Sequence, residues 1–281
     1  MFGPESSVVL DEYICTSRRN REICTLESLR HQVTKMTDIA AQNKEKFDKD
    51  ASTHLSDWAE LIQAIINELV ARRHWMSSKW VDSESSAAGG RDIRLLDYAC
   101  GSGTVSKALL PFITQAVGLD ISTGMVSECN KWAQSTGLDS DKVWAYEYDM
   151  LAGEESKRLP QQKLSDFDIV VVSMALHHVS DPTKLMQRLA KCLRPGGTCV
   201  ILDRVHDSTS SRTDLTLSTS QAEMLKTVNQ HGFSEGEMRR LYQDAGLGHK
   251  FDYVVIPHPF KAQVFGQELS ITGFIARGEL V

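Results

Sequence analysis

The chain has 281 residues, of which 41% are hydrophobic and 24% are charged, with 18 glycines and 7 prolines. This length fits one large domain or two small ones, and the composition excludes collagen-like, largely disordered and multi-pass membrane proteins. The net charge of -6 provides no general attraction for a polyanion, so a nucleic-acid partner is not expected.

Cysteine usage and apolar runs indicate the compartment. The six cysteines are dispersed and form no CxxC pair, which suits a reducing compartment better than a disulfide framework. The longest apolar runs fall far short of the roughly 20 residues that cross a bilayer, so no membrane span is expected. The first 35 residues balance basic with acidic side chains, unlike secretion signals or transit peptides. We therefore expect a cytoplasmic protein.

The amino-terminal part is predicted to lie outside the main domain. Residues 1–35 show no sustained periodicity and are predicted to form a disordered, dispensable tail. Residues 36–90 are predicted to form a helical cap and a linker. Apolar side chains recur at helical spacing from Leu55 to Val70, and a small-residue stretch follows from Ser83 to Gly90.

Residues 91–281 are predicted to form an α/β domain, in which short apolar strands alternate with helices. The predicted strands are Ile93–Asp97, Ala116–Asp120, Val143–Tyr148, Phe167–Ser173, Thr198–Asp203, Phe251–Ile256 and Leu269–Ala276, and the predicted helices are Thr104–Phe112, Thr123–Gln134, Pro182–Leu193 and Ser234–Ala245. Such alternation favours an open sheet of parallel strands, whose ligand lies beyond their carboxyl ends. Residues 207–230 interrupt the alternation and are predicted to cover the site.

Glycines and acidic residues gather at the expected carboxyl ends of the strands. Gly101 and Gly103 follow the first strand, where the absence of a Cβ allows a tight turn and close approach of a ligand. Asp120 ends the second strand and can accept both hydroxyls of a ribose. Asp149 follows the third strand and can accept an adenine amino group. Ordinary turn geometry and helix capping are the alternative roles.

The glycine loop departs from the G-x-G-x-x-G pattern of dinucleotide-binding proteins, because Ser106 occupies the third glycine position. That pattern also directs helix amides at a pyrophosphate, whereas Asp97 places a carboxylate just before the loop. The acidic side chain instead suits a ligand with an ammonium group. A nicotinamide-dependent oxidoreductase is therefore disfavoured.

The stretch Asp97–Gly103 (DYACGSG) resembles motif I of class I S-adenosylmethionine (SAM)-dependent methyltransferases, and Asp120, Asp149 and Leu193–Gly197 fall where later motifs of that family lie. Residues 47–51 (FDKDA) resemble the entry segment of the small-molecule branch, which includes ubiquinone and menaquinone biosynthesis methyltransferases. The resemblance implies a Rossmann-like class I methyltransferase fold. Such a fold has a mostly parallel seven-stranded sheet, helices on both faces and an N-terminal helical cap.

The same resemblance implies the cofactor contacts. It places Gly101 and Gly103 at the methionine part of S-adenosyl-L-methionine and Asp120 at the ribose. Asp97 helps to position the amino-acid end, directly or through water. Asp149 and Met150 frame the adenine, and Ile121 and Met125 are candidates for apolar contact with the adenine, with packing in the core as the alternative. Tyr98 and Ser173 complete the implied cofactor site.

The implied reaction is in-line attack of a small organic acceptor on the SAM methyl group. It needs no protein nucleophile, because orientation of the two reactants can supply much of the rate. His177 and His178 follow the fourth strand, at the expected reactive end of the cofactor, where either can act as general base or can instead shape the cofactor loop. Of the two, His178 is the preferred candidate.

The expected partner is the small-molecule methyl acceptor, bound by a monomer or homodimer. The histidines lack metal-ligand spacing, so no metal is expected. The sequence leaves the acceptor atom open. It also leaves open an alternative function, a catalytically idle SAM-binding regulatory protein.

Overall fold

The computed structural model describes residues 39–81, 92–152, 164–206, 226–264 and 267–281. The predicted tail at 1–35, the predicted linker at 83–90 and most of the predicted cover at 207–230 lie outside the described residues. All elements described below belong to one structural unit, Ile39–Val281.

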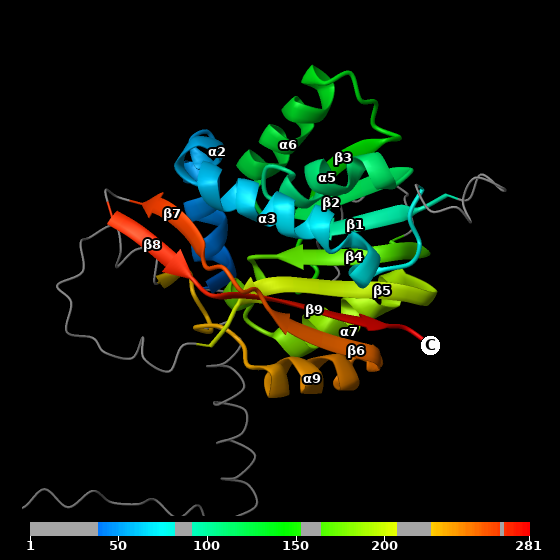
Figure 1. The fold of residues 1–281 in the computed structure, drawn as a ribbon. Coiled ribbons are helices and arrows are strands. Elements are labelled where there is room, and N and C mark those ends of the chain that lie inside the picture. Colours follow the sequence, from blue (N-terminus) through cyan, green and yellow to red (C-terminus); the bar gives the residue numbers. More distant parts are fainter. Residues whose placement is uncertain (1–38, 82–91, 153–163, 207–225, 265–266) are drawn as a thin grey trace, which may run out of the picture. The chain divides into compact units, whose positions relative to one another are not determined.

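A seven-stranded sheet forms the centre of this unit, with the strand order β3-β2-β1-β4-β5-β9-β6 (Figure 1). Its strands are β1 (Arg94–Tyr98), β2 (Gln115–Asp120), β3 (Val143–Glu147), β4 (Phe167–Ser173), β5 (Leu193–Arg204), β6 (His249–Val255) and β9 (Gly273–Glu279). Strands β1 to β5 pair in parallel, and β9 runs antiparallel between β5 and β6. The predicted mostly parallel sheet is confirmed.

In the described part of the chain, helices precede β1 and follow β1, β2, β4 and β5. They are α2 (His54–Asp57), α3 (Ala59–Ala71), α4 (Arg73–Met76), α5 (Thr104–Leu109), α6 (Thr123–Ser135), α7 (Pro182–Cys192) and α9 (Glu235–Asp244), with 3-10 turns η1 (Leu110–Phe112) and η2 (Leu176–His178). Residues 39–50 form a further helix. Ser122, Asp181 and Ser234 begin α6, α7 and α9 as N-cap residues, each accepting a backbone N–H three residues on. Within the described ranges, no helix has the length and apolar character needed to span a bilayer.

Alternating side chains of the central strands enter two separate cores. Leu95 of β1 belongs to the core that includes α3 and α5, whereas Leu96 belongs to the core that includes α7 and α9. Ile169 and Val170 of β4 divide in the same way. Strands buried on both faces have continuous apolar sequences, which explains why the sequence predicted them well. Helices α3 and α5 accordingly cover one face of the sheet, and α7 and α9 cover the other (Figure 1).

Two predicted elements are wrong because each is divided into two elements in the structure. The predicted helix from Leu55 to Val70 is interrupted at Trp58, whose backbone (φ -113°, ψ 18°) separates α2 from α3. The predicted strand Leu269–Ala276 is two strands. Its first part belongs to β8 (Gln267–Ile271), which pairs with β7 (Phe260–Val264) in a separate sheet, while β9 begins at Gly273. A Cβ at Gly273 would lie 2.4 Å from the Phe260 ring, so glycine allows the chain to pass there.

Candidate functional site

A cavity of about 540 Å³ lies at the carboxyl ends of β1, β2 and β4, where the strand order reverses. Open α/β sheets bind ligands at this position, and the volume suits a small-molecule site. From the strand ends and the turns after them, the lining residues include Tyr98, Gly101, Asp120, Ile121, Asp149, Ser173, His177 and His178. Further lining comes from residues 39–50, α2, α3 and β8.

The turn after β1 uses backbone conformations that favour glycine. Gly101 and Gly103 have φ angles of +52° and +90°, in the left-handed region. A Cβ at Gly101 would meet no atom within 4 Å, and Gly101 lines the cavity. A Cβ at Gly103 would lie 2.9 Å from Sγ of Cys129 on α6, and Gly103 caps α5 outside the cavity lining. Gly101 thus leaves room for a ligand, whereas Gly103 allows close helix packing.

Asp97 lies behind this turn, outside the cavity lining. Its Oδ2 accepts hydrogen bonds from the backbone N–H of Ser106 at 3.0 Å and from the Ser106 hydroxyl at 2.7 Å. Its Oδ1 is buried and has no hydrogen-bond partner among the described residues. Burial raises the pKa of Asp97 to about 7, although the Ser106 hydrogen bonds act in the opposite direction. The serine that breaks the dinucleotide pattern is therefore the partner of Asp97, a contact that the sequence did not predict.

Asp120 ends β2, is only 7% exposed and lines the cavity. Its Oδ2 accepts the backbone N–H of Gly101 and its Oδ1 accepts that of Ser122, both at 2.8 Å. Burial raises the pKa of Asp120, although these two hydrogen bonds lower it. Each carboxylate oxygen retains a second acceptor site, which can receive a hydroxyl of a ligand in the cavity.

The other predicted cofactor residues divide between the cavity and the core. Tyr98, Ile121, Met125, Asp149 and Ser173 line the cavity, whereas Met150 packs in the core that includes α7 and α9. The Ser173 Oγ is buried and has no hydrogen-bond partner in the described part of the chain, so a polar ligand group can pair with it. Oδ1 of Asp149 accepts the backbone N–H of Leu151 at 2.7 Å, which orders the turn after β3.

His177 is paired with a buried carboxylate. Its Nδ1 lies 2.6 Å from Oδ1 of Asp203, and its backbone N–H donates to the other oxygen at 3.2 Å. Burial raises the pKa of Asp203, but the charge and hydrogen bonds of His177 more than offset this effect and hold it below its ordinary value. An ionised Asp203 accepts a hydrogen bond from Nδ1–H, so in the neutral form of the His177 ring the lone pair lies on Nε2.

His178 has a different environment. Its Nδ1 lies 2.7 Å from the carbonyl oxygen of Thr227, and a carbonyl only accepts, so Nδ1 is the donor and Nε2 carries the lone pair. Burial, and next the charge of His177, lower the pKa of His178 to about 3. The centroid of its ring lies 4.0 Å from that of His177 and 5.5 Å from that of Phe47, and the His178 and Phe47 rings are nearly perpendicular. His178 is therefore a neutral and weakly basic imidazole.

Sequence reasoning missed the cavity residues of the helix at 39–50. Ile39, Asn43, Phe47 and Asp50 line the cavity, at the spacing of one helical face. Nδ2 of Asn43 donates to the carbonyl oxygen of His178 at 3.1 Å, and its Oδ1 is buried and unpaired among the described residues. The periodicity of this short segment was the available signal.

Residues 226–230, the described part of the predicted cover, contact η2 (Leu176–His178). The backbone N–H groups of Asn229 and Gln230 donate to the carbonyl oxygen of His177 at 2.9 and 3.0 Å. His206 and His231 are exposed and lie outside the cavity lining. Within the described ranges, no three His, Cys, Asp or Glu side chains are grouped so that they could hold a metal ion.

Comparison with known sequences identifies relatives. Residues 72–248 match the family model described as a methyltransferase domain. An uncharacterized methyltransferase of Schizosaccharomyces pombe is 29% identical over 54% of this chain and 52% of its own length. A ubiquinone biosynthesis O-methyltransferase of Burkholderia vietnamiensis is 27% identical over 42% of this chain and 46% of its own. The chain spans about half the length of these curated relatives.

Two solved structures share the fold. A SAM-dependent methyltransferase from Anabaena variabilis matches with a TM-score of 0.60 and 15% identity, over 86% of this chain and 95% of its own. Magnesium protoporphyrin IX methyltransferase from Synechocystis, solved with bound SAH (S-adenosylhomocysteine), matches with a TM-score of 0.54 and 14% identity, over 86% of this chain and 100% of its own. At these identities the likeness establishes the fold.

Proposed function

Because this chain belongs to the methyltransferase domain family, we propose that it transfers the methyl group of SAM to a small organic molecule by in-line displacement. The matched residues, 72–248, make up more than half of the chain, and the domain is that of a SAM-dependent methyltransferase, which is an enzyme. The cavity is the observation that carries the proposal, because Gly101, Asp120 and His177 line it together.

The residues around the cavity fit SAM. Asp120 has acceptor sites for the ribose hydroxyls, and the open space beside Gly101 admits a ligand chain close to the backbone. Ser173 Oγ and Asn43 Oδ1 are buried polar atoms without partners in the described ranges, and a polar ligand would satisfy them. Asp97 acts from behind, since it holds the glycine turn through Ser106.

When bound, SAM supplies a methyl group on a positively charged sulfonium, which an acceptor can attack directly. Asp120 and the glycine turn would fix the cofactor end of the cavity, while residues 39–50 and α3 would shield it from water. Holding two reactants in line can lower a barrier by about 7–11 kcal/mol. The main task of the chain is therefore orientation.

His177 is the better-placed general base, which reverses the preference for His178 drawn from the sequence. Asp203 orients the His177 ring through Nδ1 and would stabilise the imidazolium that forms when Nε2 takes a proton from the acceptor. His178, with a pKa of about 3, holds a proton too weakly for this role. Nε2 of His178 can instead accept a hydrogen bond from the substrate that receives the methyl group.

The cavity wall favours a small acceptor with an apolar body. Trp58, α3 and β8 contribute apolar side chains to this wall. They are Trp58, Leu61, Ile62, Ile65, Leu269 and Ile271. A volume of about 540 Å³ lies within the usual range for small-molecule sites. The adjacent histidines suit an acceptor with a dissociable O–H, N–H or S–H group.

Calorimetric titration with SAH, the demethylated product, tests the cofactor site. Asp120→Ala is expected to weaken SAH binding by roughly 10- to 100-fold, the effect of losing hydrogen bonds to a charged group. His206→Ala, at an exposed position outside the cavity lining, is the matched control. Absence of SAH binding by the wild-type protein, or unchanged affinity after Asp120→Ala, would contradict the proposal.

Turnover tests the chemistry. Incubation with methyl-labelled SAM and a metabolite extract is expected to yield a labelled small molecule. His177→Gln and Asp203→Asn should each lower its rate of formation by about 10²–10⁴-fold, as for loss of general-base catalysis, without changing SAH affinity, and His178→Gln should lower it less. SAH binding without any labelled product would instead indicate an idle cofactor-binding protein.

A further inference from the structure

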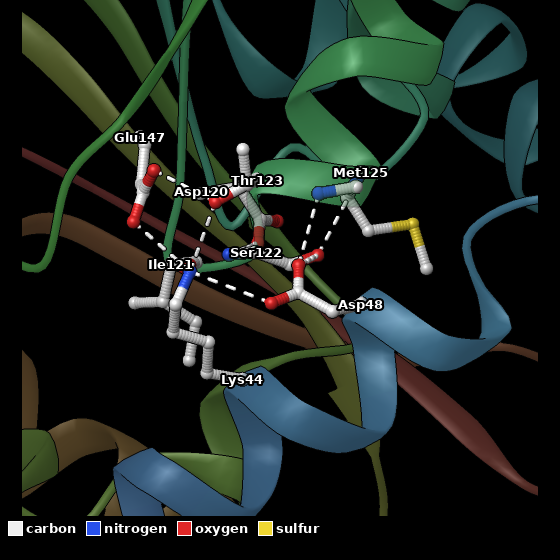
Figure 2. A network of polar contacts seen from close by, with 9 residues as sticks. Lys44, Asp48, Asp120, Ile121, Ser122, Thr123, Met125 and Glu147 are labelled. Carbon is white, nitrogen blue, oxygen red and sulfur yellow. Dashed lines mark hydrogen bonds and ion pairs between the residues drawn. The ribbon is translucent and has the colours of Figure 1, made fainter.

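The helix at residues 39–50 has a polar face next to the face that lines the cavity. Lys44 and Asp48 lie one helical turn apart on this face, outside the cavity lining, and both reach the turn between β2 and α6. Figure 2 shows both side chains extending from the helix toward residues 120–125. This turn contains Asp120 at its start.

Lys44 joins three segments of the chain. Its ammonium group has three protons and finds three acceptors. They are the carbonyl oxygen of Ile121 at 2.9 Å, Oγ1 of Thr123 at 3.1 Å and Oε1 of Glu147 at 2.9 Å. Burial lowers the pKa of Lys44, but its contacts with Glu147 and Asp48 outweigh this effect and raise it. The charged lysine thus ties the helix to the turn after β2 and to the end of β3.

Asp48 supports the first turn of α6. Its Oδ1 accepts the Ser122 hydroxyl at 2.7 Å and the backbone N–H of Gly124 at 2.9 Å. Ser122 is itself the N-cap of α6, and its backbone N–H donates to Asp120 at 2.8 Å. A direct chain of hydrogen bonds therefore leads from Asp48 through Ser122 to the carboxylate that faces the cavity.

Gly124 allows the helix to approach this closely. A Cβ at Gly124 would lie 2.8 Å from Cβ of Ala51 and 3.1 Å from the backbone oxygen of Asp48. The same helix contacts the other end of the cavity, where Asn43 donates to the carbonyl oxygen of His178. The helix therefore bridges the turn that follows β2, which we call the Asp120 turn (residues 120–123), and η2, the histidine turn (Leu176–His178).

We propose that Lys44 and Asp48 are positioning residues for the cofactor site, which hold the helix at 39–50 against the Asp120 turn and thereby set the affinity for the ribose end of SAM. The inference rests on the proposed function, because it takes the cavity as the SAM site. Lys44 and Glu147 are 39% and 49% exposed, and such exposed pairs contribute little to overall stability. Their effect belongs to the local geometry of the site.

The experiment compares variants that release the helix by different means. Asp48→Ala removes the acceptor of Ser122 and Gly124, whereas Asp48→Asn keeps an acceptor oxygen. Gly124→Ala removes no charge and favours helix formation by α6 itself, but its methyl group would displace Ala51 and Asp48. Lys131→Ala, which breaks an exposed pair with Glu128 on α6, is the control.

Calorimetry with SAH is expected to show binding weakened by about tenfold or more in Asp48→Ala and Gly124→Ala, the effect of a lost charge-assisted hydrogen bond. Asp48→Asn should recover most of the affinity, and Lys131→Ala should stay within about twofold of wild type. Binding of 5′-methylthioadenosine, which has the ribose but no amino-acid end, should weaken by the same factor as binding of SAH. Wild-type affinity in both releasing variants, or a loss confined to SAH, would overturn the proposal.

Hydrogen exchange without ligand separates this inference from the proposed function. Amides of residues 39–50 should exchange faster in Asp48→Ala and Gly124→Ala than in the wild-type protein or in Lys131→Ala, while melting temperatures confirm that all variants are folded. Unchanged exchange would overturn the positioning role even where wild-type SAH binding is intact. Failure of the wild-type protein to bind SAH would instead refute the proposed function, and the inference would fall with it.

Discussion

Asp97 is buried and His178 is half-buried, and in both groups burial favours the neutral form. Burial raises the pKa of Asp97 to about 7 and lowers that of His178 to about 3. One group is an acid and the other a base, so their contributions to stability change with pH in opposite directions. Between their ordinary pKa values these contributions partly cancel in the wild-type protein, and single variants are needed to separate them.

For Asp97, the folded protein without ligand binds the carboxyl proton more tightly than the unfolded chain. The resulting stability is fully present below the ordinary pKa of 3.8 and is lost as the pH rises through about 7. The Asp97→Asn side chain cannot ionise, so the stability of this variant lacks the contribution that changes with pH. As the pH rises from 4 to 8, the free energy of unfolding of the wild type should therefore fall relative to that of the variant, by up to roughly 4 kcal/mol. Urea unfolding between pH 4 and pH 8 measures the difference, and parallel pH profiles would contradict it.

For His178, the folded protein binds the ring proton less tightly than the unfolded chain. Its contribution to stability is present above the ordinary pKa of 6.5 and is lost as the pH falls toward about 3. His178→Gln should therefore lose less stability than the wild type between pH 6.5 and pH 4. Nitrogen NMR of the ring should show a neutral imidazole with the proton on Nδ1 at pH 5.5, and a midpoint of titration near 6.5 would refute the assignment.

Among the elements, α5 and α6 each have a backbone N–H near their amino terminus that donates to a carboxyl group at the end of the preceding strand. Asp97 at the end of β1 accepts the backbone N–H of Ser106 in α5, and Asp120 at the end of β2 accepts that of Ser122 at the start of α6. The first backbone N–H groups of a helix have no partner within the helix, and a carboxyl oxygen can accept from them. The acids that the sequence assigned to the ligand therefore also fix the first turns of the helices that follow.

The β1–α5 turn should separate ligand binding from packing. Gly103→Ala is expected to lower the free energy of unfolding by about 1–2 kcal/mol through its left-handed backbone, with a further cost from contact with Cys129, and to change SAH affinity less. Gly101→Ala carries similar backbone strain but adds its methyl group to the cavity, so its main loss should be SAH affinity. Urea unfolding and SAH titration of both variants test this. The prediction would be contradicted if the loss of SAH affinity, relative to the loss of unfolding free energy, were the same in both variants.

For the molecule as a whole, the cavity draws on segments from Ile39 to Ile271. A ligand that contacts so many segments should bind the folded state alone, and it then stabilises the entire fold. The strand-order reversal at β1 brings these segments to one end of the sheet. Binding and global stability are therefore coupled.

SAH at about 100 times its Kd should add about 2.7 kcal/mol to the free energy of unfolding, which for a domain of this size raises Tm by about 5–10 °C. A thermal-shift measurement checks this, with NAD as a ligand that should give no shift. Equal shifts with both ligands would point to a different nucleotide site.

We also propose that residues 1–35 are dispensable for this coupling, because their sequence lacks sustained periodicity. A chain that begins at Met36 is expected to show the same SAH-induced rise in Tm as the full chain. Loss of folding or of the shift after this deletion would contradict the proposed boundary.

The strand ends could be predicted from sequence because their signals are local. Apolar runs identified β1, β2 and β4, and the glycines after β1 marked a turn with unusual backbone angles. Asp120 was correctly expected at the end of β2, and it lines the cavity. Asp97, Gly103 and Met150, which the resemblance assigns to the cofactor, lie outside the cavity lining, and their cofactor roles stay predictions, because sequence proximity to a site does not say which way a side chain points.

By itself, the sequence determined the mostly parallel sheet and the gathering of Gly101 and Asp120 at its carboxyl edge, since periodicity and glycine freedom depend on neighbouring residues alone. Only the tertiary structure decided that His177 pairs with Asp203, 26 residues away, and that Asp48 reaches the Asp120 turn. It also decided that β8 and β9 join different sheets. The physical reason is that each of these contacts depends on how distant segments pack, and a side chain with several possible partners carries no local signal of which one packing will bring to it.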